Sequence, residues 1–322
     1  TWHASLDSYR DQEQTRLRQL TIDGTGSSSA HDILIRAQLA ETTKLRLHAS
    51  GGVAGQSASS ALRWDGQLTE LSVTGNLPVH LQSPVALSVQ KQSIMLGPTR
   101  LALSDGYLAI EQFQWTPKDW KTRGHFSGVA IHPSYRDASQ QSAVHLGGRW
   151  NWASHTRLEG HLHIQREQGD WFLPGEIPQP FGLKTLQLKV DAQDNKLTGS
   201  VELSSETIGT IQTRATLPLH STSDGWSIST TTPISGAIQT RITNLKWLDE
   251  LLGESMNADG SLQIQADVHG TWKQPVFSGT ATGQDLSLLH LDHGIDLQQG
   301  NLVAHFDDSN LIIDHLRFNS LL

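Results

Sequence analysis

The sequence contains no cysteine among its 322 residues. This absence excludes disulfide bonds, thiol catalysis and zinc sites built from cysteine ligands. It does not decide the compartment, although a cysteine-free chain suits an oxidising periplasm. An apolar run of about 18 residues and a recognisable signal peptide are also missing, so the sequence predicts neither a membrane-spanning helix nor an export signal of its own.

Charge is scarce, and positive charge is scarcest. Charged residues make up 17% of the chain, and 24 lysines and arginines against 32 acidic residues give a net charge of -8. This balance argues against a nucleic-acid partner, which requires a basic face. Hydrophobic content of 36% with 28 glycines fits neither a helical bundle nor a disordered tail. It is typical of amphipathic sheets, in which half of each strand faces water.

Apolar residues alternate with polar ones along most of the chain, most clearly in residues 258–320. The pattern repeats at every second position from Leu262 to Val268 and again from Leu302 to Phe306. Successive side chains of a strand point to opposite faces, so this alternation predicts strands with one apolar and one polar face. Turn signals such as Asp259-Gly260 separate the runs. The sequence predicts an all-β, elongated and curled sheet with at most one or two short helices.

Three sections are expected along the chain. Residues 1–165 are predicted to form stacked short strands, and residues 166–182, which are rich in proline, a loop or seam. Residues 183–322 are predicted to form a second strand section with a short helix near 245–252, capped by Asn244 and ended by Gly253. Because both ends of the chain look cut, we expect it to be a piece of a longer protein.

Paired histidines are the candidate metal ligands. His161 and His163 lie on the polar side of one predicted strand, and His290 and His293 flank Leu291-Asp292. Neither pair has a third ligand at short spacing, and zinc sites use three or four. The sequence therefore predicts no metal site.

Carboxylates beside an aromatic residue are the candidate catalytic group. Glu167, Asp170 and Glu176 cluster near Trp171, and paired carboxylates can cleave glycosides. Turn chemistry or salt bridges explain them more simply in a proline-rich loop. The motifs Gly-x-Ser-x-Gly and Gly-x4-Gly-Lys-Ser/Thr are absent from the sequence. We therefore expect no enzyme, no catalytic residue and no cofactor.

Tryptophans at the ends of strand repeats have two interpretations. Trp64, Trp150 and Trp272 stand where a half-buried indole can cover the rim of a sheet. Stacking against sugars is the alternative, as in a carbohydrate-binding β-sandwich. Their repeated position favours the structural role.

Recurring short segments carry a resemblance to a known family. Leu146-Gly-Gly-Arg-Trp150 leads to Leu158-Glu-Gly160, and Gly270-Thr-Trp272-Lys-Gln-Pro275 leads to Phe277-Ser-Gly279. With Gly294 to Leu297, Gly300-Asn-Leu302 and the segment Arg166-Glu-Gln-Gly169-Asp170, these resemble the repeating unit of the TamB family. AsmA-like relatives share the Gly-x-Trp-x-x-Pro cadence.

The resemblance implies a fold, a place and a function. The family fold is a long curled sheet with a hydrophobic groove, the β-taco. The family is periplasmic, anchored in the inner membrane of Gram-negative bacteria, and works with TamA, an outer-membrane barrel. It is linked to phospholipid movement between the membranes and to outer-membrane protein assembly. This chain would be an internal periplasmic section, with the anchor and the partner contact outside it.

The apolar face of the predicted strands has little sequence to cover it, so it must fold on itself or hold a ligand. Acyl chains suit it, because their burial needs no directional partner and yields roughly 0.8 kcal/mol per CH₂. A one-residue slip moves every side chain to the other face, so the facing of each strand stays open. The groove is expected to be lined by Leu162, Ile164, Leu186, Leu188, Val190, Val201, Leu203, Ile238, Ile242, Leu262, Ile264, Val268, Leu297, Leu302, Phe306, Ile313 and Phe318.

Three functions remain open from the sequence. The first is a non-enzymatic conduit for phospholipids between the inner and outer membranes, also linked to outer-membrane protein assembly. The second is a scaffold or chaperone that offers sheet edges to outer-membrane β-barrel proteins. The third is a carbohydrate-binding β-sandwich.

Overall fold

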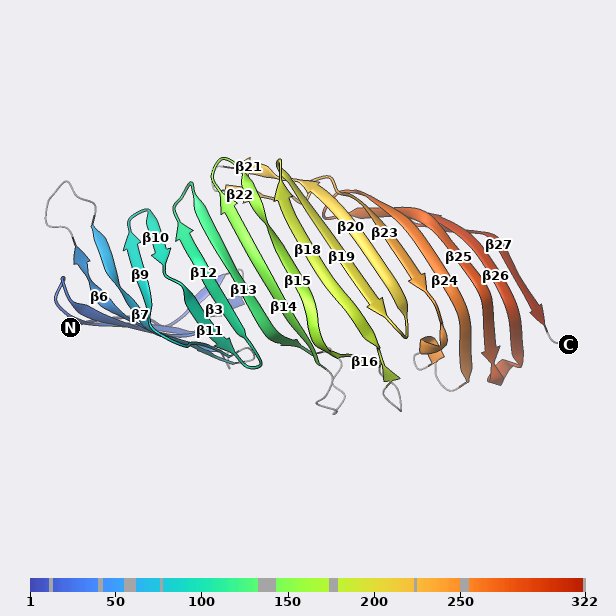
Figure 1. The fold of residues 1–322 in the computed structure, drawn as a ribbon, viewed down its shortest axis with the longest axis horizontal. Helices are drawn as coiled ribbons and strands as arrows, with labels where there is room; N and C mark the ends of the chain where they lie inside the picture. Colours follow the sequence, from blue (N-terminus) through green and yellow to red (C-terminus); the bar gives the residue numbers. More distant parts are fainter. Residues whose placement is uncertain are drawn as a thin grey trace. The chain divides into compact units, whose positions relative to one another are not determined.

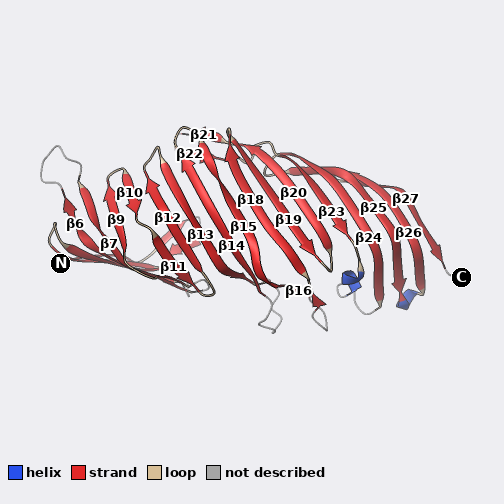
Figure 2. Ribbon diagram, in the orientation of Figure 1, coloured by secondary structure: helices blue, strands red, loops and turns tan. Residues whose placement is uncertain are grey.

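A computed structural model describes residues 1–11, 14–39, 43–54, 62–75, 78–132, 143–173, 179–222, 225–249 and 255–320. These residues form 27 strands and two short 3₁₀ helices, η1 (Lys246–Leu248) and η2 (Leu291–His293). Hydrogen bonding joins 21 of the strands into one antiparallel sheet (Figures 1 and 2). The prediction of an all-β chain with at most two short helices is confirmed for the described residues.

The chain divides into two compact units. The N-terminal unit comprises residues 1–129 and 147–156, and the C-terminal unit comprises residues 130–146 and 157–322. The proline-rich segment 166–182 falls within the C-terminal unit. Strands β13 (Trp120–Ile131) and β14 (Ala143–Ser154) contribute residues to both units.

The N-terminal unit is a series of antiparallel hairpins. The remaining strands that it contributes to the large sheet are β1 (Trp2–Leu6), β4 (Gln19–Gly26), β5 (His31–Gln38), β6 (Lys44–Ala54), β7 (Arg63–Thr74), β8 (Val79–Leu81), β9 (Val85–Gln90), β10 (Ser93–Leu96), β11 (Thr99–Leu103) and β12 (Tyr107–Trp115). Strand β7 pairs with both β8 and β9, and β12 with both β10 and β11. The register sets apolar residues beside apolar residues, as in the row Ile22, Ile35, Leu47 and Leu71.

The C-terminal unit continues this pattern with longer strands. Its strands in the large sheet are β15 (Leu158–Asp170), β18 (Leu183–Gln193), β19 (Lys196–Ser205), β20 (Gly209–Pro218), β23 (Ser235–Ile242), β24 (Met256–Gly270), β25 (Pro275–His290), β26 (Ile295–Asp307) and β27 (Asn310–Ser320). Each pairs antiparallel with the next in this order. In Figure 1 the later strands of this unit bend along their length.

Three two-stranded ribbons lie outside the large sheet. They are β2 (Tyr9–Asp11) with β3 (Gln14–Leu17), β16 (Phe172–Leu173) with β17 (Gln179–Pro180), and β21 (His220–Thr222) with β22 (Gly225–Ser227).

Full burial is rare, because a single sheet covers its own side chains only in part. In the N-terminal unit, Ala49, Leu68 and Val85 form a small buried cluster from β6, β7 and β9, with Leu47 and Trp64 packed against it. Backbone hydrogen bonds between neighbouring strands therefore hold much of this unit together. On its polar face, Asp23 accepts hydrogen bonds from His3 and Arg36, and these partners lower the pKa of that carboxyl.

Aromatic rings lie over glycines on neighbouring strands. The ring of Trp64 occupies the place where a side chain of Gly51 or Gly66 would stand, and that of Trp150 does so at Gly124. Their indole nitrogens are also used: Trp64 donates to His31 Nε2 at 2.8 Å and Trp150 to Thr122 Oγ1 at 3.0 Å. These contacts support the structural interpretation of both tryptophans. Trp272 differs, since it is 54% exposed.

Two expectations need adjustment. Asn244 Oδ1 accepts a hydrogen bond from Lys246 N at 2.7 Å, but the N-cap residue of the described three-residue helix η1 is Leu245 rather than Asn244. The remainder, with Leu251, Leu252 and Gly253, lies outside the described residues. The β-sandwich alternative does not fit, because a sandwich needs two large packed sheets and the described strands form one.

The contact between Trp150 and Gly124 predicts a local cost for any side chain at this glycine. A Cβ added at Gly124 would meet the Ala109 carbonyl at 2.3 Å and the Trp150 ring at 2.5 Å. We expect Gly124→Ala to lower the free energy of unfolding by about 1–3 kcal/mol, the usual effect of overpacking. Urea titration followed by tryptophan fluorescence measures it. Gly199→Ala is the control, because nothing lies within 4 Å of its added Cβ; equal losses in both variants would contradict the account.

Candidate functional site

The apolar face of the C-terminal unit is built from rows of side chains that cross its strands in direct register. Partners in antiparallel strands point to the same side, so each row can be followed from strand to strand. One row consists of Ile164, Leu188, Val201, Thr213, Ile238, Ala266, Gly279, Phe306 and Leu311. The next row consists of Leu186, Leu203, Ile211, Thr240, Ile264, Ala281, Ala304 and Ile313.

The register brings the sequence-predicted groove residues together. All of them except Leu297 lie on this one face. Phe318 is placed there by its ring, which covers Gly300 next to Leu286, while Leu286 in turn lies over Gly283 beside Leu302. Leu297 pairs with Leu288 beyond register shifts in β25 and β26, so its side is not fixed by the rows.

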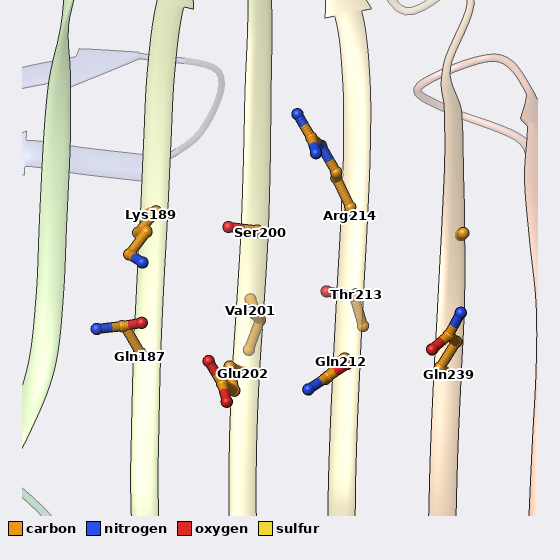
Figure 3. Close-up of a pocket in the computed structure, with 10 residues that line it drawn as sticks. Gln187, Lys189, Ser200, Val201, Glu202, Gln212, Thr213, Arg214 and Gln239 are labelled. Atoms are coloured by element: carbon orange, nitrogen blue, oxygen red, sulfur yellow. The ribbon is translucent and has the colours of Figure 1, made fainter.

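The opposite face is polar and equally regular. Its central row consists of Gln165, Gln187, Glu202, Gln212, Gln239, Gln265, Thr280 and His305. A shallow depression on this side is lined by Gln187, Lys189, Glu202, Gln212 and Arg214 among others (Figure 3). These long polar side chains lie over β18, β19 and β20, on the side away from the predicted groove residues. Val201 and Thr213, which belong to the first apolar row, also line the depression, so its lining is mixed in character.

The two faces also differ in exposure. Along β23 the polar positions are exposed and the intervening ones half-buried without exception. A bent sheet draws together the side chains on its inner side, so at β23 the lower exposure of the apolar face marks it as the inner one, whereas both faces of the last strand, β27, are exposed. Few of its side chains are fully buried, among them Leu217, Ala266, Val268 and Ala304. The face is therefore a half-open apolar strip, uncovered by a second layer within the described residues.

Small residues leave room along part of this strip. A third row runs through Leu162, Val190, Gly199, Ala215, Gly236 and Val268. At Gly199 nothing lies within 4 Å of the position that a Cβ would occupy. Space above the sheet at this point is therefore open, with Val190 and Ala215 as its flanking partners.

A protein-family model matches most of the sequence of this chain. The model described as "TamB, N-terminal domain" matches residues 8–282. The chain belongs to the TamB family. No curated protein and no solved structure matches the sequence.

Members of the TamB family share a cellular location, a kind of partner and a general role. The family belongs to a translocation and assembly module, has a general involvement in lipid transport, and is a periplasmic family anchored in the inner membrane. It works with TamA-like partners and is a transport and assembly family rather than a known enzyme family. In this TamB-family chain, none of the described helices has the length and apolar character needed to cross a membrane.

In this TamB-family chain the Asp170 carboxylate links two neighbouring strands through hydrogen bonds to backbone N–H groups, which we call the Asp170 latch. Asp170 accepts hydrogen bonds from the backbone N–H groups of Trp171 at 2.9 Å, Gly182 at 2.8 Å and Leu183 at 3.0 Å. Its oxygens are thus engaged in joining the end of β15 to the start of β18. Arg166 donates to the Gly169 carbonyl at 2.9 Å and completes the turn. Glu176 lies outside the described residues. The turn interpretation of Asp170 fits these contacts.

Other candidate ligands are dispersed. His163 interacts with Gln187 at 2.7 Å, while His305 contacts Asp314 at 2.8 Å. Throughout the part of the chain that the structure describes, no three His, Asp or Glu side chains form a cluster fit for a metal ion. His290 and His293 do meet each other, at the turn between β25 and β26.

The Asp170 latch predicts a loss of stability when its carboxylate is removed. Asp170→Ala leaves three backbone N–H groups without their acceptor, which we expect to cost about 1–3 kcal/mol of unfolding free energy. Urea unfolding checks the value, and hydrogen exchange at Gly182 and Leu183 should accelerate. Asp191→Ala, on the exposed polar side of β18, is the matched control. An Asp170→Ala variant as stable as the control would refute the latch.

Proposed function

We propose that the apolar face of the C-terminal unit binds the acyl chains of phospholipids and carries them between the inner and outer membranes. The continuous rows of aliphatic side chains without a covering layer support this proposal most directly. The function is non-enzymatic, because transfer along such a face breaks no bond. The proposal also offers a physical basis for the general involvement of the TamB family in lipid transport.

The dimensions of the strip suit a lipid. Nine neighbouring strands spaced by about 4.8 Å span roughly 38 Å in the C-terminal unit. Each buried CH₂ group of an acyl chain contributes about 0.8 kcal/mol to the binding free energy, so burial of a few such groups holds a lipid. Successive rows offer an acyl chain similar apolar contacts. A lipid that moves from one row to the next therefore replaces the contacts that it loses with equivalent ones. A uniform apolar track therefore binds without fixing the lipid at one position.

The proposed setting follows that of the family. The chain would act in the periplasm as part of a longer protein anchored in the inner membrane. A TamA-like outer-membrane barrel would be its partner, through other parts of that longer protein. Phospholipid headgroups would remain in water at the strand ends, because ionised phosphate is costly to bury.

The conduit hypothesis is tested by photo-crosslinking at two adjacent positions. Ile264 lies on the apolar face and Gln265 on the polar face of the same strand, β24. With benzoylphenylalanine at either position in the protein in its host cells, we expect phospholipid to be captured from position 264 at least about tenfold more than from position 265. Mass spectrometry of the adducts measures this ratio. Equal capture, or none from position 264, would count against the conduit.

A blocking pair refines the same test. Gly199→Phe places a ring in open space on the apolar face, whereas Ser200→Phe places it on the polar face. We expect Gly199→Phe to reduce lipid capture at position 264 several-fold with unchanged unfolding, and Ser200→Phe to leave capture intact. Circular dichroism establishes that both variants fold. If both phenylalanines had the same effect, the apolar face would not be the track.

A second candidate function is favoured by strand β27. This strand pairs with β26, and its large apolar side chains are exposed on both faces: Leu311 by 66%, Ile312 by 50%, Ile313 by 52% and Leu316 by 51%. Strands with such exposed side chains can pack against an added strand of a client protein. We propose β27 as the place where a scaffold or chaperone for outer-membrane β-barrel proteins would hold a client strand.

The scaffold hypothesis makes a different crosslinking prediction. Benzoylphenylalanine at Leu311 or Ile312 should capture barrel proteins, because an added strand sets its side chains beside those of β27 on both faces of the sheet. Gln239, in the middle of the sheet, is the control position. Adducts are identified by proteomics. Capture of phospholipid alone at positions 311 and 312 would remove the scaffold function.

A further inference from the structure

His290 and His293, one of the two histidine pairs noted in the sequence, form a facing pair of imidazoles in the structure. Their Nδ1 atoms lie 3.2 Å apart. The ring centroids are 4.3 Å apart and the ring planes are nearly perpendicular, at 87°. Rings whose Nδ1 atoms pointed straight at each other would have more distant centroids. The rings therefore meet edge to face, with their Nδ1 atoms at hydrogen-bond distance.

The backbone holds the pair in place. His290 ends β25 in an extended conformation, and Gly294 closes the η2 turn with a φ of 60°, which suits glycine. The turn is fixed by hydrogen bonds from Leu291 N to the Ser255 carbonyl at 2.9 Å and from Gly294 N to the Leu291 carbonyl at 3.2 Å. Strand pairing of His290 with Met256 and Ile295 secures the other side. The two rings thus meet on a defined hairpin end.

The environment of this pair differs from that of five other histidines in the described chain. His3, His48, His125, His155 and His305 each contact a carboxylate. His290 and His293 face each other instead, so a single proton between them is the most that their Nδ1 atoms can share. A cation that accepts both lone pairs satisfies both nitrogens at once.

The separation of the two nitrogens matches the bite of a transition metal. Zinc binds imidazole at about 2.0–2.1 Å, and a tetrahedral angle between two such bonds sets the nitrogens about 3.3 Å apart. Square-planar geometry brings them slightly closer. The observed 3.2 Å lies within this interval without movement of the backbone.

We propose that His290 and His293 chelate one borderline divalent transition-metal ion, such as Zn²⁺ or Ni²⁺, through their Nδ1 atoms. Imidazole suits these metals, in contrast to calcium and magnesium, which take oxygen ligands. Within the described residues no third His, Asp or Glu joins the pair, so water fills the remaining coordination positions. Bound metal ties both ends of η2 together and stabilises the β25–β26 hairpin.

Calorimetric titration of the untagged chain with Zn²⁺ alone, and separately with Ni²⁺ alone, tests the site. We expect one saturable site per chain and a rise in melting temperature with metal concentration. His290→Gln and His293→Gln should each weaken that site at least about tenfold. Zn²⁺ should also shift the imidazole resonances of both histidines in the NMR spectrum.

The control is a second histidine pair. His161 and His163 lie on the same face of β15, and His163 is engaged by Gln187. The double variant His161→Gln/His163→Gln should keep the full affinity. Two results would overturn the proposal: no saturable binding of either metal up to millimolar concentration, or affinity unchanged in His290→Gln and His293→Gln. Since the site lies apart from the lipid-facing rows, the outcome is independent of the proposed lipid function.

Discussion

Continuous antiparallel register is the interaction on which both faces of this sheet depend. Every strand step from β15 to β27 pairs a residue with one on the same side, so a single alternating pattern becomes a set of rows. A slip by one residue in any strand would insert a polar side chain into an apolar row. Backbone hydrogen bonds fix the lateral spacing, and side-chain alternation fixes the register. Neither would suffice alone.

The fold manages without a thick core because small and aromatic residues complement each other. Trp64 covers Gly51 and Gly66, Trp150 covers Gly124, and Phe318 covers Gly300. Each ring shields glycine backbone that would otherwise weaken a strand. These ring–glycine contacts also keep side chains from projecting far above the apolar face. A surface proposed to carry flexible acyl chains requires this. Gly199, where no ring intervenes, leaves open space of the kind that a ligand can use.

Much of this was predictable from sequence, and the remainder depended on three-dimensional information. Alternation in β24 and β26 predicted the strands, and their common face follows because alternation and antiparallel pairing share the same period. Leu297 was predicted to line the groove, but register shifts near Asp285 and Gln299, both at positive φ, are invisible to a two-residue pattern, so its place in the groove stays a prediction. The ring–glycine contacts were missed because they depend on cross-strand partners. The sequence singled out His290 and His293 as a pair, but the contact between their rings depends on the η2 turn. Asp170 was interpreted as turn chemistry or a salt-bridge partner because its surroundings are rich in proline.

The central claim is that phospholipid contacts one face of the C-terminal unit and not the other. Isoleucine methyl NMR of the chain with a phospholipid that carries a spin label on its acyl chain tests it most directly. Neighbours in β27 supply the contrast, because Ile313 lies in an apolar row and Ile312 pairs with His305 on the polar side. The account predicts strong broadening of the methyl signals of Ile238, Ile264 and Ile313, with Ile312 little affected. Equal broadening on both faces, or none on the apolar face, would contradict it.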